Sequence, residues 1–250
     1  MVVVRRFAKP RTLVEEVAAH LRERILDGTI SPGERLYELR LTRELALSRS
    51  PLREAFRMLA TEGLVTISPR RGTAVRPISI EELRDVSEMR TLFETFALAR
   101  AAQRGAGDQV EHMRGLLAEA RGALARRNVE AWYESSQRFH DAIIDSAGNA
   151  QLKSLYDFIK LSMRRYQLLV IGLPRHPDRS QAEHQKIFDA FVSGDGRRAC
   201  ARLEDHIRRE ADTLAAALAG AQRREKPARP RRRRRPPPRR LSRLSPLRAR

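Results

Sequence analysis

Three histidines, His140, His184 and His206, carry the side chains of this sequence that are best suited to bind a metal ion. Each lies in a different segment whose apolar residues recur at helical spacing. Neutral imidazole is the commonest protein ligand for zinc, nickel and similar ions, and three converging imidazoles leave coordination positions open. Spacing alone, however, favours three separate buried histidines over one shared site.

Three arginines near the start of the chain, Arg49, Arg53 and Arg57, recur at four-residue steps and therefore fall on one face of a predicted helix. Guanidinium groups pair bidentately with the edge of guanine in the major groove of DNA, and the first turn of a helix offers free N–H groups to a phosphate. We therefore expect Arg49 and Arg53 to contact DNA. Arg57 lies further from the helix start, and we expect it to be solvated, with Glu54 or Glu62 as its partner.

The elements that must position these arginines are three short helices followed by a hairpin. Thr12 and Glu15 form a capping box that begins the first helix, and the Ser-Pro pair at residues 50–51 predicts the start of the third. Apolar periodicity predicts helices at 12–28, 36–47 and 50–62 and strands at 64–68 and 73–75. This order predicts a winged helix-turn-helix. Arg70 and Arg71 lie at the hairpin tip, where they could reach phosphates or the minor groove.

Residues 78–222 show only helical patterns. Ser79 and Glu82 form a second capping box, and glycines break the pattern at 105–107 and at Gly148. The helices expected are residues 79–104, 108–127, 128–147, 151–169, 179–192 and 197–218. The predicted fold is therefore mainly α, with the N-terminal winged helix-turn-helix followed by an all-α, six-helix antiparallel bundle large enough for a core of its own.

The net charge of +19 is concentrated at the two ends of the chain. Residues 1–77 contain 15 basic and 9 acidic side chains, residues 78–222 contain 21 of each, and residues 223–250 contain 14 basic and 1 acidic. A basic head indicates a polyanionic partner, and a neutral middle indicates a different task. We therefore predict a DNA-binding domain at 1–77, a helical domain at 78–222 and a disordered Arg/Pro-rich basic tail at 223–250.

The tail either adds salt-sensitive, non-specific affinity for nucleic acid or is an unselected extension.

The remaining composition limits the class of protein. No run of about 18 uncharged apolar residues predicts a membrane helix, and residues 1–7 are unlike a signal peptide. The single cysteine, Cys200, excludes an internal disulfide and a cysteine metal cluster. We expect a cytoplasmic protein that binds no membrane.

The first domain resembles the winged helix of the GntR family of transcriptional regulators. The resemblance is carried by residues 25–36, 48–59, 62–65 and 70–72, and it covers nearly all of 10–76. It implies that operator DNA is contacted by the residues that match the family's contacts, which are Arg49, Ser50, Arg53, Arg71 and Gly72. At the corner of the helix-turn-helix, Ala46-Leu47-Ser48 stands where the family usually has Gly-Val-Ser.

Residues 80–215 resemble the FCD effector domain of the FadR/VanR branch of the same family, through segments 88–94, 132–140, 147–152, 183–187 and 206–207. In metal-binding members an aspartate and three histidines hold a divalent ion such as Zn²⁺ or Ni²⁺. The histidines match His140, His184 and His206, whereas the aspartate is replaced by Ser136. The resemblance therefore implies a metal site that has lost a negative charge, so that either its affinity for Zn²⁺ or Ni²⁺ falls or a water or an effector carboxylate fills the place. Arg90 matches an arginine that pairs with an organic-acid effector in some members; otherwise it would be a surface arginine paired with Glu94.

Two functions are compatible with these features. The first is a ligand-responsive transcription factor, more commonly a repressor, which binds an inverted-repeat DNA operator as a homodimer and responds to a small carboxylate effector in the helical domain. The second is a metal-dependent hydrolase or isomerase that uses His140, His184 and His206. No nucleophile constellation and no phosphate-binding glycine loop accompanies the histidines, and an enzyme would not need the DNA-binding domain. We therefore expect a regulator and not an enzyme.

Overall fold

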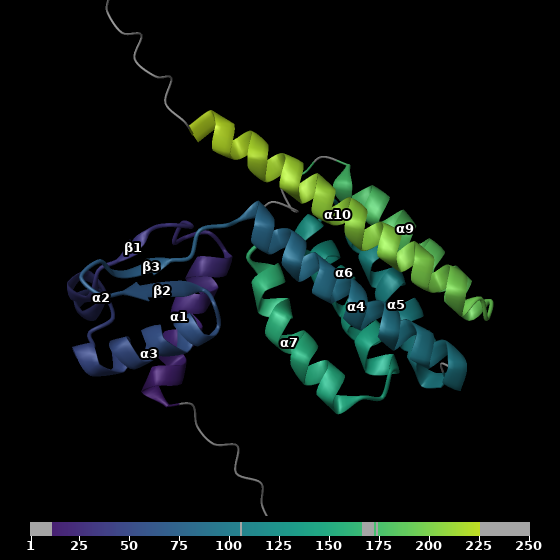
Figure 1. Cartoon of the computed structure of the whole chain (residues 1–250), viewed down its shortest axis with the longest axis horizontal. Coiled ribbons are helices and arrows are strands. Elements are labelled where there is room, and N and C mark those ends of the chain that lie inside the picture. The colour runs from purple at the N-terminus through teal and green to yellow at the C-terminus, as the bar shows by residue number, and fades with distance from the viewer. Residues whose placement is uncertain (1–11, 106, 167–172, 174, 226–250) are drawn as a thin grey trace, which may run out of the picture.

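A computed structural model describes residues 12–105, 107–166, 173 and 175–225. Figure 1 shows a small N-terminal unit of helices and strands beside a larger unit built from long helices. This architecture confirms the predicted mainly α class. The sequence predicts a disordered basic tail at 223–250. Residues 223–225 are instead helical, and 226–250 lie outside the described residues.

The N-terminal unit contains the three predicted helices, α1 (Leu13–Leu26), α2 (Glu38–Glu44) and α3 (Arg49–Thr61). The expected capping box begins α1, since the Glu15 amide donates to Thr12 and the Thr12 amide donates to Glu15. The helices bury one apolar face each around a shared core that includes Leu21, Leu52 and Phe56. This burial, rather than local propensity, supplies most of the stability of such short helices.

The wing is a three-stranded antiparallel sheet instead of the predicted two-stranded hairpin. β2 (Val65–Ser68) and β3 (Gly72–Val75) form the hairpin, and β1 (Arg35–Leu36) pairs with the other edge of β3. The prediction that residues 36–47 form one helix was therefore wrong at its start. A two-residue strand has no periodicity of its own, and only the partner strand reveals it.

The start of α3 also differs from the prediction. Ser48, and not Ser50, is the residue that precedes the first helical turn, so that Arg49 is already helical. Pro51 is then the third residue of the helix. Proline is tolerated there because the first four N–H groups of a helix have no partner within the helix.

The larger unit contains the six predicted helices, namely α4 (Ile80–Arg104), α5 (Gly107–Ala125), α6 (Val129–Ser146), α7 (Ala150–Arg164), α9 (His176–Val192) and α10 (Gly196–Glu225). Side chains of Ser79, Asn128 and Asn149 accept hydrogen bonds from the first turns of α4, α6 and α7. α9 begins three residues before the predicted position and α10 continues to Glu225. Helix α4 packs against α6, α7 and α10, so one face of it, which includes Arg90 and Glu94, is buried in the bundle.

One buried arginine joins the bundle to the segment that leads out of the wing. Arg165, at the end of α7, donates to the carbonyl oxygens of Arg76 and Pro77 at 3.0 and 2.7 Å and to the carboxylate of Glu82 at 2.8 Å. Glu82 belongs to the first turn of α4. The link between the two units is therefore held by specific hydrogen bonds.

None of the helices within the described ranges is long and apolar enough to span a membrane.

Candidate functional site

The exposed edge of α3 carries the residues predicted to contact DNA. Leu52, Ala55 and Phe56 bury the inner face of this helix, while Arg49, Ser50 and Arg53 are exposed. The steps of one and four residues bring the three polar side chains to the same end of the helix. The start of α3 thus presents two guanidinium groups, a hydroxyl and free backbone N–H groups to solvent.

Two of the arginines on α3 are paired within the domain. Arg53 Nε lies 2.9 Å from the carboxylate of Glu38 on α2, and Glu38 also raises the pKa of the guanidinium. Arg57 pairs with Glu54 at 2.5 Å, as the sequence predicts. Both pairs are exposed, and ion pairs of this kind contribute only about 0–1 kcal/mol. A phosphate or a guanine edge can therefore displace Glu38 from Arg53 at small cost.

The wing tip presents its arginines as expected. Arg70 and Arg71 are exposed in the turn between β2 and β3, and Gly72 is exposed at the start of β3. The backbone turns there through two residues with positive φ, Arg70 at 67° and Gly72 at 79°. Glycine adopts this conformation without steric strain, which is a physical reason for Gly72 at this position.

The three predicted histidines converge in the core of the bundle. The Nε2 atom of His184 lies 3.1 Å from Nε2 of His140 and 3.0 Å from Nε2 of His206. All three residues are at most 1% exposed. His140 belongs to α6, His184 to α9 and His206 to α10. Ligand nitrogens about 2.1 Å from a shared ion stand roughly 3 Å apart, so this spacing fits a bound metal.

The hydrogen bonds behind the rings also fit a metal. Nδ1 of His140 lies 2.7 Å from Glu94 Oε2, and Nδ1 of His206 lies 2.8 Å from Glu183 Oε2. A carboxylate accepts, so each Nδ1 carries the proton and each Nε2 presents a lone pair. The Nε2 atom of His184 faces the Nε2 atoms of both His140 and His206, but it can carry only one proton and so can donate to only one of them. A cation would satisfy all three lone pairs at once.

Burial keeps the imidazoles in the form that binds metals. Loss of hydration lowers the pKa of His140 well below its ordinary value, and the positive charge of Arg90 acts in the same direction. The pKa of His184 is lowered chiefly by burial and further by its two histidine neighbours. Both rings are therefore neutral at neutral pH, which is the protonation state of a metal ligand.

Arg90 is part of the same cluster. Its Nε donates to Glu94 Oε1 at 2.7 Å and its Nη1 donates to Glu210 Oε2 at 2.8 Å. The hydroxyl of Tyr156 donates to Glu94 as well, at 2.8 Å. The alternative of a surface arginine is wrong, since Arg90 is 5% exposed, although the expected pairing with Glu94 is present. Glu94 thus connects the predicted effector arginine to His140.

Glu210 lies one helical turn after His206 and faces both parts of the cluster. Its Oε2 is 3.7 Å from His206 Nε2, and its Oε1 is 3.9 Å from Nε2 of the buried His176. Burial alone would raise the pKa of Glu210, but the positive charge of Arg90 acts in the opposite direction and is the largest of the influences that lower the pKa to about 2. This carboxylate is therefore ionised at neutral pH.

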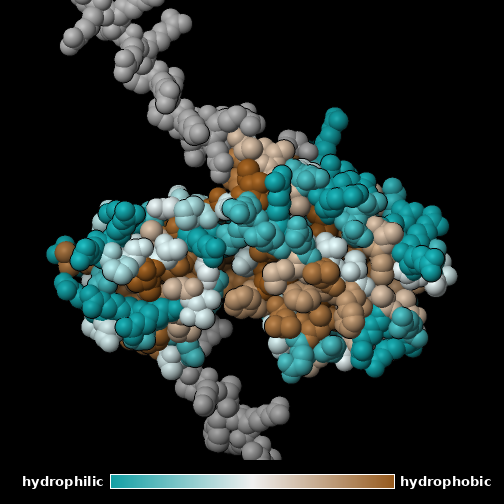
Figure 2. Space-filling model, viewed as in Figure 1, coloured by the Kyte–Doolittle hydropathy of each residue, from teal (hydrophilic) through white to brown (hydrophobic). Residues whose placement is uncertain are grey.

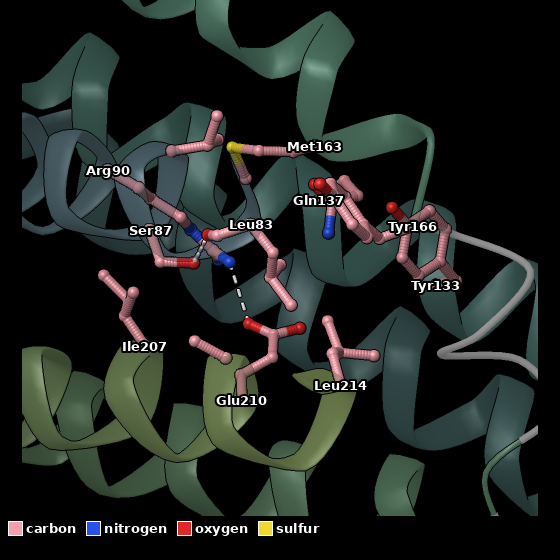
Figure 3. A pocket seen from close by; sticks show the side chains of 12 residues that line it. Leu83, Ser87, Arg90, Tyr133, Gln137, Met163, Tyr166, Ile207, Glu210 and Leu214 are labelled. Atoms are coloured by element: carbon pink, nitrogen blue, oxygen red, sulfur yellow. Dashed lines mark hydrogen bonds and ion pairs between the residues drawn. The ribbon is translucent and has the colours of Figure 1, made fainter. Parts of the chain in front are cut away.

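A pocket adjoins the cluster on the side of Arg90 and Glu210 (Figure 3). Its walls are mainly apolar and aromatic side chains of α4, α6 and α10, among them Leu83, Tyr133 and Leu214. The free space is about 30 Å³. That is room for about one water molecule, so an organic ligand requires the walls to move.

Several groups of this cluster were not predicted from the sequence: Glu94 as a partner of His140, and Glu183, Glu210, Tyr156 and His176 altogether. The only local signals were the four-residue steps from Arg90 to Glu94 and from His206 to Glu210, because such steps bring side chains to one helix face. The contacts between helices have no counterpart in sequence spacing.

An arginine-edged winged helix joined to a helical domain with a polar core defines a DNA-binding regulator with an effector-binding domain. Residues 13–75 match the gntR family of bacterial regulatory proteins, and residues 85–209, half of the chain, match the FCD domain family. The chain belongs to the GntR family of transcriptional regulators, in the FadR-like branch that carries an FCD domain.

Individual relatives agree with this assignment. The chain is 26% identical to the HTH-type transcriptional repressor RspR of Escherichia coli over 80% of its own length and 88% of the relative. It is 29% identical to the repressor GlaR of the same species, over 80% and 94% of the two lengths. The structure of E. coli McbR/YncC superposes with a TM-score of 0.67 at 18% identity, covering 84% of this chain and 100% of that one, and so shares the fold. The protein is a transcriptional regulator and not an enzyme, and the hydrolase alternative is not supported.

Proposed function

We propose that this protein is a repressor that binds an inverted-repeat operator as a homodimer and that a small carboxylate effector in the helical domain changes its affinity for DNA. The observation that carries the proposal is the exposed arginine edge of α3. Arg49, Ser50 and Arg53 would read base edges and phosphates in the major groove, and Arg71 and Gly72 would contact the flanking backbone. A cytoplasmic location follows from this function.

The homodimer is supported by an apolar surface on the bundle. Five large apolar side chains on the neighbouring helices α4 and α7 are between 40% and 68% exposed, namely Met89, Leu92, Phe96, Leu155 and Phe158. Figure 2 shows the corresponding apolar area on the face of the bundle. Burial of such a patch against a second copy would join two winged helices with two-fold symmetry, and one winged helix alone reads too few base pairs.

The effector domain is proposed to hold a divalent metal on His140, His184 and His206. The geometry of the three rings and the neutral state of His140 and His184 support this, and the ion would supply a positive centre to which an acid can bind. The function of Arg90 would be to orient that acid. The charge of Arg90 is balanced by its ion pairs with Glu94 and Glu210. An incoming carboxylate therefore has to displace Glu210 before it can form a bidentate pair with Arg90.

A contiguous route leads from the pocket to the DNA-binding domain. Leu83 lines the pocket, and the preceding residue, Glu82, accepts the hydrogen bond of Arg165. Arg165 in turn holds the carbonyl groups of the linker at Arg76 and Pro77. An organic effector requires the walls of the pocket to move, and Leu83 of α4 is one of those walls. A movement of α4 would disturb the contact of Glu82 with Arg165 and change the spacing of the two winged helices.

The decisive experiment measures binding to genomic fragments and then to the selected operator by electrophoretic mobility shift. We expect Arg49→Ala and Arg53→Ala to lose specific binding by roughly tenfold or more each, since a good bidentate contact contributes about 1–3 kcal/mol of discrimination. Arg57→Ala is the matched control, because it removes the same charge from the same helix at an arginine paired with Glu54. Equal losses in all three variants, or normal specific binding by Arg49→Ala and Arg53→Ala, would contradict the assignment of α3.

A further inference from the structure

The metal site proposed above has no carboxylate at the position where the resemblance to metal-binding FCD domains implies an aspartate. Ser136 stands one helical turn before His140 on α6 and is buried, so a neutral hydroxyl occupies that position. A divalent ion in a buried site is more stable when a negatively charged ligand binds it. A carboxylate near the three Nε2 atoms would supply that charge.

Glu210 is a carboxylate beside the metal-facing nitrogen of His206. It follows His206 by four residues on α10, so the two side chains share a helix face, and Oε2 lies 3.7 Å from the His206 nitrogen that points to the metal position. Glu94 and Glu183 are otherwise engaged, since each bonds the rear Nδ1 atom of a histidine. Of the carboxylates in the described cluster, Glu210 is thus the one that approaches the converging face of the rings.

The contacts of Glu210 allow it to reach an ion at this position. Its Oε2 accepts from Arg90 at 2.8 Å and lies 3.7 Å from His206 Nε2, so a small movement of the carboxylate would bring it to an ion held by the three rings. We infer that Glu210 of α10 is the carboxylate ligand of the metal in this protein and takes the place left by Ser136 on α6.

This inference rests on the proposed metal site, and the two can be separated by experiment. Zn²⁺ affinity is measured by competition with a chromogenic chelator on the full chain, and Co²⁺ spectra report the ligand field. We expect Glu210→Gln to weaken Zn²⁺ binding by about tenfold or more and to change the Co²⁺ spectrum, because the amide keeps the shape and loses the charge. Glu183→Gln, which alters the rear contact of His206 and the exposed pair with Arg209, should have the smaller effect.

The strongest test is a rescue. In the Glu210→Gln background, Ser136→Asp returns a carboxylate from α6 and should restore Zn²⁺ affinity. Far-UV circular dichroism in EDTA checks that each variant is folded, and Glu210→Asp replaces Glu210→Gln if the latter is not. Unchanged Zn²⁺ affinity in the Glu210 variant, or a loss that Ser136→Asp does not restore, would show that Glu210 is a partner of Arg90 and not a metal ligand. If wild type binds no Zn²⁺, or His184→Ala binds it equally well, the metal site itself is wrong.

Discussion

Ala46 lies at the turn between α2 and α3, where the backbone has to reverse within a few residues. Its φ is +52°, and the Leu47 amide donates to the Thr42 carbonyl at 3.0 Å, which is the hydrogen bond of a Schellman motif. Glycine is the usual residue at this position, because a Cβ makes the left-handed conformation costly by about 1–2 kcal/mol. The chain therefore stores strain at the corner of its helix-turn-helix.

Replacing that residue should stabilise the DNA-binding domain. We expect Ala46→Gly to raise its free energy of unfolding by roughly 0.5–1 kcal/mol, since relief of strain exceeds the added entropy of the unfolded chain. Gly33→Ala is the reciprocal control: its φ is +82° and a Cβ there meets no atom within 4 Å, so only backbone strain acts. Urea denaturation measures both, and a lower midpoint for Ala46→Gly would show that the turn is not strained.

At the scale of elements, Arg165 joins three segments, which are the end of α7, the first turn of α4 and the linker after the wing. Its side chain is 3% exposed and its guanidinium makes three hydrogen bonds. Without the guanidinium, the carboxylate of Glu82 and two backbone carbonyl groups lose a donor. Arg76 and Pro77 are exposed and Glu82 keeps an ion pair with Arg76, so each lost bond should cost about 0.5–1.5 kcal/mol.

We therefore expect Arg165→Met to loosen the linker while the core of each unit remains folded. Hydrogen–deuterium exchange of the peptides that cover residues 76–84 should rise, and exchange in α3 and α6 should stay constant. Arg164→Met is the matched control, because the neighbouring arginine is exposed. If both variants exchange like wild type, the linker is held by other contacts and the proposed route from the pocket is not supported.

At the scale of the whole molecule, the apolar surface of α4 and α7 is the feature that a monomer leaves unexplained. Leu92 and Phe158 are each 68% exposed, and they lie on neighbouring helices. Large exposed apolar patches on otherwise soluble domains mark interaction sites. A second copy is the occupant that the proposed inverted-repeat operator requires.

A charged residue on this surface should separate the subunits. We expect wild type to sediment at about twice the chain mass of 28.6 kDa and the double variant Leu92→Glu, Phe158→Glu to sediment as a monomer with weaker operator binding. Val192→Glu, at an exposed apolar residue of α9, is the control and should remain a dimer. Dimerisation of the double variant would exclude this surface as the interface.

Local patterns in the sequence were sufficient to predict the classes of element. Caps at Thr12 and Ser79, helical periodicity and glycine breaks predicted three helices, a hairpin and six further helices, because such signals depend on neighbours in the chain. The same signals failed at β1 and at the start of α3. There the conformation is decided by pairing with β3 and by packing of the whole helix-turn-helix.

By itself, the sequence determined the winged helix, the all-helical second unit and the arginine edge of α3, since each follows from residue type and periodicity along a single element. His140, His184 and His206 could be named from the sequence, but only the tertiary structure decided that their Nε2 atoms meet. It also decided that Arg90 is buried between Glu94 and Glu210. These contacts join side chains of four helices. They could not be predicted from the sequence, because the angles at which helices pack are set by the surfaces of many side chains and not by the spacing of a few residues.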